Sequence, residues 1–241
     1  MSFLFIHIPK CGGTSISEVV MPNRVQLCQG NNGYFWVDNG YPQPTIDMII
    51  TGCVGDKRIA PSDNLSSYDY IFSVVRNPWD RALSWYHWHI NDMNTTDKNK
   101  SHFSWYKQFE SFSDWVKKGM STPHISPFNM MEWIKYGGNP DLVCKRINKR
   151  RSSCPKRGYL YGGLSEIIPD SIYKMEDLFN VEKDNWSLLM EKCGLDPQTK
   201  RKHLNSSGKR KNMKQYYTIE TAQIVYDKCK EDIEFFNYKF F

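Results

Sequence analysis

The pattern of apolar and polar residues along this chain predicts strands and helices that alternate. Short apolar runs rich in β-branched and aromatic residues, such as residues 70–75, predict buried strands. Longer stretches with apolar residues three and four positions apart predict helices with one buried stripe, most clearly in residues 218–236, where Thr218 is the candidate N-cap. The predicted strands are 2–8, 46–51, 69–75 and 171–175, and the predicted helices are 15–22, 78–91, 103–119, 127–136, 182–193 and 218–236.

This order of elements predicts an α/β fold. Right-handed strand–helix–strand connections build a central parallel sheet that is flanked by helices. The segments 23–45 and 92–101 are rich in Asn, Gly and Asp, and we predict loops there. At 241 residues the chain is long enough for one sizeable core, so we expect a single domain over residues 1–241.

The first candidate site follows the first predicted strand, where residues 8–15 read Ile-Pro-Lys-Cys-Gly-Gly-Thr-Ser. A strand, a tight glycine-bearing turn and a helix N-terminus together present backbone N–H groups and a positive helix end to a phosphate. Lys10 adds a mobile cation to this turn. The segment is not a Walker A loop, because there the Lys follows the last Gly and directly precedes Ser or Thr.

The second candidate site follows the strand at 70–75, where residues 75–84 read Val-Arg-Asn-Pro-Trp-Asp-Arg-Ala-Leu-Ser. Asn77 is a good helix N-cap, and Asp80 has the position of the acid in a capping box. Arg76 therefore lies at the carboxyl end of a strand, and Ser84 lies about two turns into the next helix. Open parallel sheets bind ligands at the carboxyl ends of their strands, so we expect both sites to line one crevice.

Together, these two motifs resemble the phosphosulfate-binding motifs of sulfotransferases that use 3′-phosphoadenosine 5′-phosphosulfate (PAPS), and they are most similar to the carbohydrate (heparan/chondroitin-type) branch. The resemblance implies a P-loop-like three-layer fold in which the first loop holds the 5′-phosphosulfate, while Arg76 and Ser84 hold the 3′-phosphate. It continues weakly through residues 172–178 and 203–207. The residues of the two motifs that it implies for cofactor binding are Lys10, Cys11, Gly12, Gly13, Thr14, Ser15, Arg76 and Ser84.

Basic residues are clustered in the second half of the chain. The formal net charge is +6, from 32 basic and 26 acidic residues. The segment 205–211 reads Asn-Ser-Ser-Gly-Lys-Arg-Lys and coincides with the C-terminal cofactor segment of the resembled family. Ser207, Lys209 and Arg210 are therefore candidates to close over the 3′-phosphate or the adenine, with a plain surface loop as the alternative. We expect no nucleic-acid partner, because no nucleic-acid-binding module accompanies the basic clusters.

The resemblance implies transfer of a sulfuryl group from PAPS to an acceptor hydroxyl by in-line displacement, with PAP as product. We expect the acceptor to be a carbohydrate or another hydroxyl compound, and many sulfate acceptors are acidic glycans that suit a basic rim. Negative charge grows on the oxygen that bridges sulfur to the 5′-phosphate. Lys10 is our candidate to stabilise that charge in the transition state. The reaction needs no metal, and we expect none.

The base that accepts the proton of the acceptor is ambiguous in the sequence. The family often has a His before the second motif, but Cys53 stands at the corresponding place in residues 51–56. His124 is the first candidate for the catalytic base, with Asp56 and Glu176 behind it. That none of the three is the base stays open.

Two other functions stay open at this point. One is a non-catalytic nucleotide- or glycan-binding module on the same fold, and the missing His keeps it open. The other is a P-loop-type small-molecule kinase, which would normally show the Walker order and a Mg²⁺-binding acid.

The cysteines and the hydropathy pattern suggest where the protein works. The seven cysteines are scattered and lack metal-ligand spacing, so we expect free thiols in a reducing compartment. No apolar run approaches the roughly 20 residues of a membrane-spanning helix. We therefore expect a cytoplasmic enzyme without a transmembrane segment.

Overall fold

The computed structural model of the chain describes residues 3–8, 10–20, 24–30, 33–38, 48–50, 69–93, 108–120, 129–131, 134, 169–202 and 212–240. The chain divides into two compact units. Unit 1 consists of Met1–Val75 with His124–Leu204, and unit 2 consists of Arg76–Pro123 with Asn205–Phe241.

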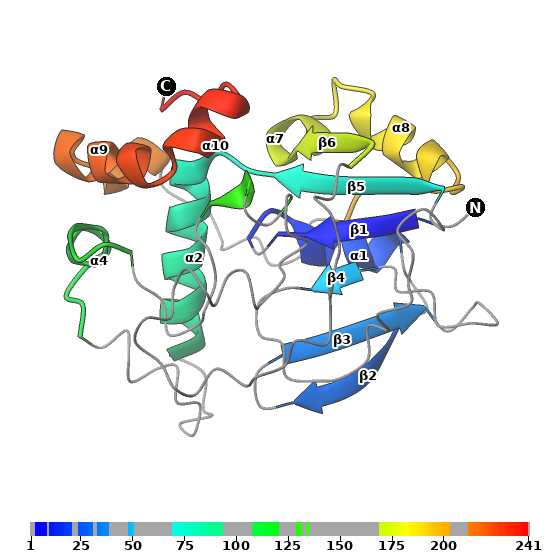
Figure 1. The fold of residues 1–241 in the computed structure, drawn as a ribbon, viewed down its shortest axis with the longest axis horizontal. Helices are drawn as coiled ribbons and strands as arrows, with labels where there is room; N and C mark the ends of the chain where they lie inside the picture. Colours follow the sequence, from blue (N-terminus) through cyan, green and yellow to red (C-terminus); the bar gives the residue numbers. More distant parts are fainter. Residues whose placement is uncertain are drawn as a thin grey trace, which may run out of the picture. The chain divides into compact units, whose positions relative to one another are not determined.

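Unit 1 contains a four-stranded parallel sheet in the order β4-β1-β5-β6 (Figure 1). Every strand of this sheet lies within two residues of a predicted one, so the strand predictions and the parallel sheet are confirmed. Apolar β-branched and aromatic runs form such strands because both faces of a parallel sheet are normally covered. The strands are β1 (Phe3–His7), β4 (Met48–Ile50), β5 (Tyr70–Val75) and β6 (Ser171–Lys174).

A separate antiparallel hairpin corrects our prediction that residues 23–45 form a loop. It consists of β2 (Arg24–Gly30) and β3 (Gly33–Asp38), and Gly30 pairs with Gly33. Only two residues separate the strands in the sequence, and Asn- and Gly-rich composition is typical of such short hairpin connections. We predicted a loop over residues 23–45 from their Asn- and Gly-rich composition, but this composition is that of a connection between two strands.

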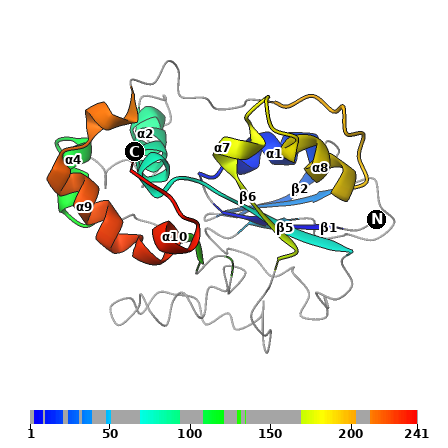
Figure 2. The same cartoon turned by 90° about the horizontal axis from the view of Figure 1, so that it is seen from above.

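The core of unit 1 lies on one face of the parallel sheet. Side chains at every second strand position point to this face, and Phe5 stacks on Phe72 with ring centroids 4.7 Å apart. Three helices pack against them and lie on the same side of the strands (Figure 2). These helices are α1 (Gly13–Val20), α7 (Met175–Leu178) and α8 (Asn185–Lys192).

The opposite face of β5 is covered as well. Ser73 and Val75 alternate with the core-facing residues of this strand, and both are buried. The α/β class with helices on a parallel sheet is thereby confirmed for unit 1. The complete three-layer arrangement stays a prediction, as does the single domain.

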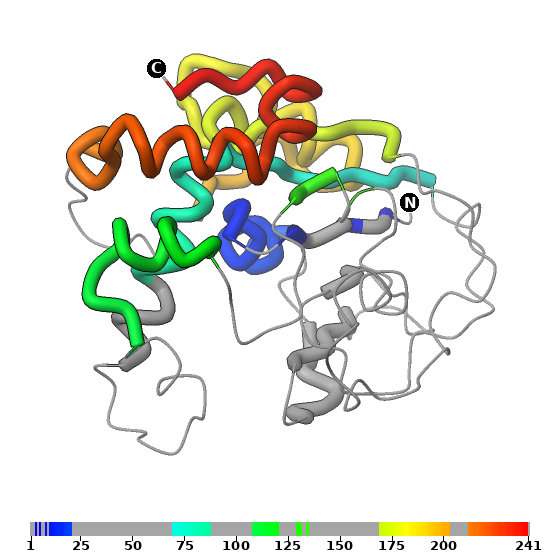
Figure 3. The backbone as a smooth tube through the Cα atoms, turned by 60° about the vertical axis from the view of Figure 1, so that its left-hand side comes forward, coloured from blue at the N-terminus to red at the C-terminus, as the bar shows by residue number. Residues whose placement is uncertain are grey.

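Unit 2 is helical, and α9 lies beside both α2 and α4 (Figure 3). The predicted helix 218–236 is divided at Cys229 into two helices, although its apolar stripe continues through the division. Residues 103–119 were predicted as one helix, whereas the helix described there covers only 112–117. The elements are α2 (Pro78–Met93), α4 (Phe112–Lys117), η2 (Met213–Tyr216), α9 (Ile219–Lys228) and α10 (Lys230–Phe235).

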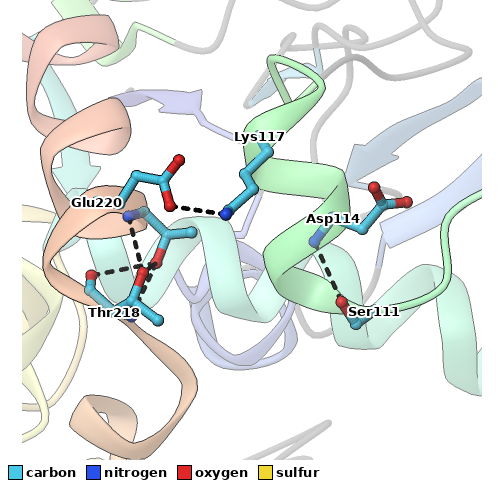
Figure 4. A network of polar contacts seen from close by, with 6 residues as sticks. Ser111, Asp114, Lys117, Thr218 and Glu220 are labelled. Atoms are coloured by element: carbon cyan, nitrogen blue, oxygen red, sulfur yellow. Dashed lines mark hydrogen bonds and ion pairs between the residues drawn. The ribbon is translucent and has the colours of Figure 1, made fainter.

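Polar contacts fix the ends of α4 and α9 (Figure 4). The Ser111 hydroxyl accepts a hydrogen bond from the Asp114 N–H at 3.1 Å, and the Thr218 hydroxyl accepts one from the third residue of α9 at 3.1 Å. This confirms Thr218 as an N-cap. The Lys117 ammonium lies 2.6 Å from the Glu220 carboxylate and joins the two helices.

The remaining helix predictions are close to the structure. Helix α1 begins at Gly13, two residues before the predicted start, and α8 lies inside the predicted 182–193. Met130, Met131 and Ile134 are helical, as predicted for 127–136. The sequence did not predict α7 or η2, each of which is only four residues long.

Candidate functional site

The loop between β1 and α1 has an unusual backbone. Lys10 has φ of 69° and Gly12 has φ of 82°, so both lie in the left-handed region. For a residue other than glycine this conformation costs about 1–3 kcal/mol and persists only where the surroundings impose it. The Cys11 N–H donates to the Ile8 carbonyl at 3.3 Å and closes the turn. The backbone of Lys10 is therefore held in a specific conformation just beyond the carboxyl end of β1.

Gly12 packs directly on the segment that follows β6. A Cβ at this position would lie 3.1 Å from the sulfur of Met175 and 3.3 Å from a ring carbon of Phe179. The positive φ favours glycine, and an added Cβ would require the Met175 or Phe179 side chain to shift by a few tenths of an ångström. The loop thus rests on α7, which belongs to residues 172–178, the third segment of the resemblance.

Helix α1 presents its N-terminus to the same loop. The first N–H groups of a helix have no acceptor within it, and the first helical bond here runs from the Ile16 N–H to the Gly12 carbonyl at 3.2 Å. Thr14 is exposed, whereas Ser15 is buried. The Gly13 and Thr14 N–H groups and the positive helix end suit an anion.

Cys11 has a packing role within this loop. Its side chain is buried, and its thiol lies 3.7 Å from the sulfur of Met130. Together with the bond from its N–H to Ile8, this contact supports the loop, and the role of Cys11 in cofactor binding stays a prediction.

Arg76 lies between β5 and the N-cap of α2 and is only 7% exposed. Its Nε donates to Oδ2 of Asp80 at 2.7 Å, and its Nη2 lies 2.5 Å from the same oxygen. The sequence suggested a capping role for Asp80 but not this contact, although the four-residue spacing was a signal for it.

Asn77 is the N-cap of α2, as predicted. Its side-chain oxygen accepts hydrogen bonds from the Trp79 N–H at 3.1 Å and the Asp80 N–H at 3.4 Å. Its side-chain amide donates to the Lys239 carbonyl at 3.1 Å and so joins the start of α2 to the C-terminal segment. Ser84, one turn beyond Asp80 on the same helix face, is buried.

The remaining predicted site residues fall into two groups. Glu176 is exposed on α7, next to Met175. The others lie outside the residues that the structure describes, and they are Cys53, Asp56, His124, Ser207, Lys209 and Arg210.

The sheet topology explains why the two motifs belong to neighbouring strands. β1 and β5 are adjacent and parallel, so both end at one edge of the sheet. Along the chain, the strand of this sheet that follows β1 is β4, which lies on the side of β1 away from β5. The strand that follows β5 is β6, which lies on the side of β5 away from β1. Such a reversal is a topological switch point, where open parallel sheets bind ligands outside their strand ends. The first loop follows β1, and Arg76 follows β5 in the chain.

Two further properties concern only the described part of the chain. Within it, no three His, Cys, Asp or Glu side chains are grouped so that they would hold a metal ion. None of the helices described there has the length and apolar character needed to cross a membrane.

The fold and the first loop together define an α/β protein with a strand–loop–helix that suits an anion. Comparison with protein families matches the Sulfotransferase family over residues 1–239. Because the match covers nearly the whole chain, the protein belongs to the sulfotransferase family, whose activity is the transfer of a sulfuryl group. Searches of curated proteins and of solved structures returned no match.

Proposed function

We propose that this protein transfers the sulfuryl group of PAPS to a hydroxyl of a carbohydrate acceptor. The observation that supports this most is the first loop, in which Lys10 has a left-handed backbone between a strand end and a helix N-terminus. Family membership supports sulfuryl transfer in general. The similarity of both motifs to the carbohydrate branch supports the finer assignment.

The first loop would hold the 5′-phosphosulfate of PAPS. Gly12 has a positive φ and approaches α7 closely, so the loop is shaped by glycine as a phosphate cradle is. The Gly13 and Thr14 N–H groups would donate to the anion. Because these donors are backbone groups at a helix start, they need little reorganisation to bind it.

When bound, PAPS supplies the sulfuryl group: the acceptor oxygen bonds to sulfur and loses its proton, while the bridging S–O bond breaks and leaves its electron pair on the 5′-phosphate oxygen. Lys10 would hold its ammonium near that oxygen and stabilise the growing charge. The imposed backbone conformation of Lys10 restricts where its side chain starts. A positioned cation is more effective than a mobile one for this purpose.

Arg76 and Ser84 would hold the 3′-phosphate. A guanidinium binds phosphate through two parallel hydrogen bonds, which a Lys cannot reproduce. Ser207, Lys209 and Arg210 would close over the nucleotide from the C-terminal segment. His124 is our first candidate for the base, and Glu176 is supported by its position next to Met175, the residue that contacts Gly12.

Basic segments support an acidic glycan as acceptor, and free thiols support a cytoplasmic location. In the described part of the chain, Cys193 and Cys229 are buried and form no disulfide. The proposal is tested by radiolabelled sulfate transfer from PAPS over a panel of glycans and simple hydroxyl compounds. Transfer to a glycan is expected. Binding of PAP without transfer to any acceptor would favour a binding module, and phosphate transfer from ATP would favour a kinase.

A further inference from the structure

One carboxylate oxygen of Asp80 engages the guanidinium of Arg76 from the side. The Nε of Arg76 donates to it at 2.7 Å, and Nη2 lies 2.5 Å from it. The Arg76 side chain is 9% exposed and that of Asp80 is 26% exposed, so this ion pair is screened from water more than an ordinary surface pair. The hydrogen bond from Nε and the close contact of Nη2 with the same oxygen restrict the rotamers of the Arg76 side chain.

We propose that Asp80 is a positioning residue for recognition of the 3′-phosphate, and that it sets the preference for nucleotides that have this phosphate. The inference rests on the proposed function. A guanidinium has five N–H donors along two edges. Asp80 engages the Nε edge, and the proposal assigns the Nη1–Nη2 edge to the phosphate. Ser84 follows Asp80 by four residues on the same helix face and completes this line of groups.

A purely electrostatic role for Asp80 predicts the opposite effect on binding. A carboxylate beside a bound phosphate repels it, so its removal would strengthen binding if Asp80 acted only as a charge. If Asp80 instead orients Arg76, its removal leaves the guanidinium free to adopt other rotamers. The guanidinium must then be ordered again when the phosphate binds, and the loss of rotamer entropy weakens the affinity. The sign of the change therefore separates the two roles.

The test is calorimetric titration of wild type and Asp80→Asn with PAP and with AMP, which lacks the 3′-phosphate. Asp80→Asn should bind PAP about tenfold more weakly, while its AMP affinity stays within about twofold of wild type. Asp114→Asn is the matched control. It removes the same charge from another i,i+4 pair, with Lys118 at 2.9 Å, and should leave both affinities unchanged. Equal or tighter PAP binding by Asp80→Asn, or equal losses for PAP and AMP, would overturn the proposal.

A double-mutant cycle tests whether Asp80 acts through Arg76. In an Arg76→Lys background, Asp80→Asn should change PAP affinity by less than about threefold, because the fork that it orients is gone. The same tenfold loss in both backgrounds would contradict positioning. If Asp80→Asn does not fold, Asp80→Ala serves in its place, and unchanged PAP affinity in that variant would overturn the proposal.

Failure of the proposed function gives a different result. If wild type binds AMP as tightly as PAP, recognition of the 3′-phosphate itself is wrong, whatever the variants do. If wild type prefers PAP and Asp80→Asn keeps that preference, the proposed function stands and only the role of Asp80 is lost.

Discussion

Gly12 and Met175 are so close that a Cβ on Gly12 would lie 3.1 Å from the Met175 sulfur. This contact joins the first loop, after β1, to the segment after β6, on the opposite side of β5 in the sheet order. It explains how two segments far apart in the sequence support one candidate site. A loop that is packed against a second segment keeps its N–H groups oriented without help from the ligand.

Gly12→Ala should therefore be costly for stability. A left-handed φ and a contact tighter than normal van der Waals distance add together, and we expect a loss of about 1–3 kcal/mol in the free energy of unfolding. Urea denaturation measures this loss. Gly119→Ala is the matched control, because Gly119 has φ of 85° but no heavy atom within 4 Å of the added Cβ. A loss at Gly12 no larger than that at Gly119 would mean that the contact with Met175 costs nothing.

Arg76→Lys should weaken PAP binding by about 1.5–3 kcal/mol, the range for hydrogen bonds to charged groups. The reason is geometric, because an ammonium cannot make two parallel bonds to one phosphate. Calorimetry with PAP measures the change, and titration with AMP is the control for losses unrelated to the 3′-phosphate. An Arg76→Lys variant with wild-type PAP affinity would remove Arg76 from the phosphate site.

Two buried cysteines should make stability fall at alkaline pH. Burial raises the pKa of Cys193 and of Cys229 from 9.0 to about 12. Between these values the unfolded chain loses the thiol protons while the folded protein keeps them. The free energy of unfolding then decreases as pH rises, by up to about 1.4 kcal/mol per pH unit for each thiol.

Urea denaturation at pH 8, 8.5 and 9 measures this dependence, below the ordinary tyrosine pKa of 10.0 at which Tyr70, Tyr86 and Tyr217 begin to contribute in the same direction. Cys193→Ala should have a shallower slope than wild type over the same range. The same slope in both proteins would show that Cys193 keeps its ordinary pKa when folded.

The strands of the parallel sheet could be predicted because the composition of each short segment agrees with a buried strand. Tyr70–Val75 is apolar and β-branched, and it is covered on both faces. The hairpin 24–38 was missed because its Asn- and Gly-rich connection dominates the local composition. The division at Cys229 was missed because the apolar stripe continues through it, and periodicity reports which face is buried rather than where backbone bonds are interrupted.

The candidate site could be predicted only where its groups are close in the sequence. The strand–loop–helix around Lys10 and the N-cap Asn77 depend on local order, and both follow from the motifs. The contact between Gly12 and Met175 depends on how distant segments pack, and no local pattern encodes it. The pair of Arg76 with Asp80 is local. However, an acid in the first turn of a helix also interacts favourably with the helix dipole, so the position of Asp80 did not by itself indicate a contact with Arg76.

Because the backbone of Lys10 is left-handed, we expect substitutions at this position to affect stability and activity differently. Lys10→Gly relieves a conformation that costs a non-glycine residue about 1–2 kcal/mol, so it should be at least as stable as Lys10→Ala. Both variants should lose turnover by about 10²–10³, because neither has the ammonium. Thermal unfolding of both variants measures the first part, and a Lys10→Gly protein less stable than Lys10→Ala would show that the left-handed backbone is not imposed in solution.

The central claim is that Lys10 stabilises charge on the leaving oxygen, and one paired measurement on Lys10→Ala tests it most directly. Turnover in the sulfate-transfer assay and PAP affinity are measured on the same preparations of wild type and variant. Turnover should fall by about 10²–10³, while PAP affinity falls far less, and Lys10→Arg should recover turnover only in part. A Lys10→Ala protein that loses PAP affinity but keeps wild-type turnover would contradict the claim and make Lys10 a binding residue only.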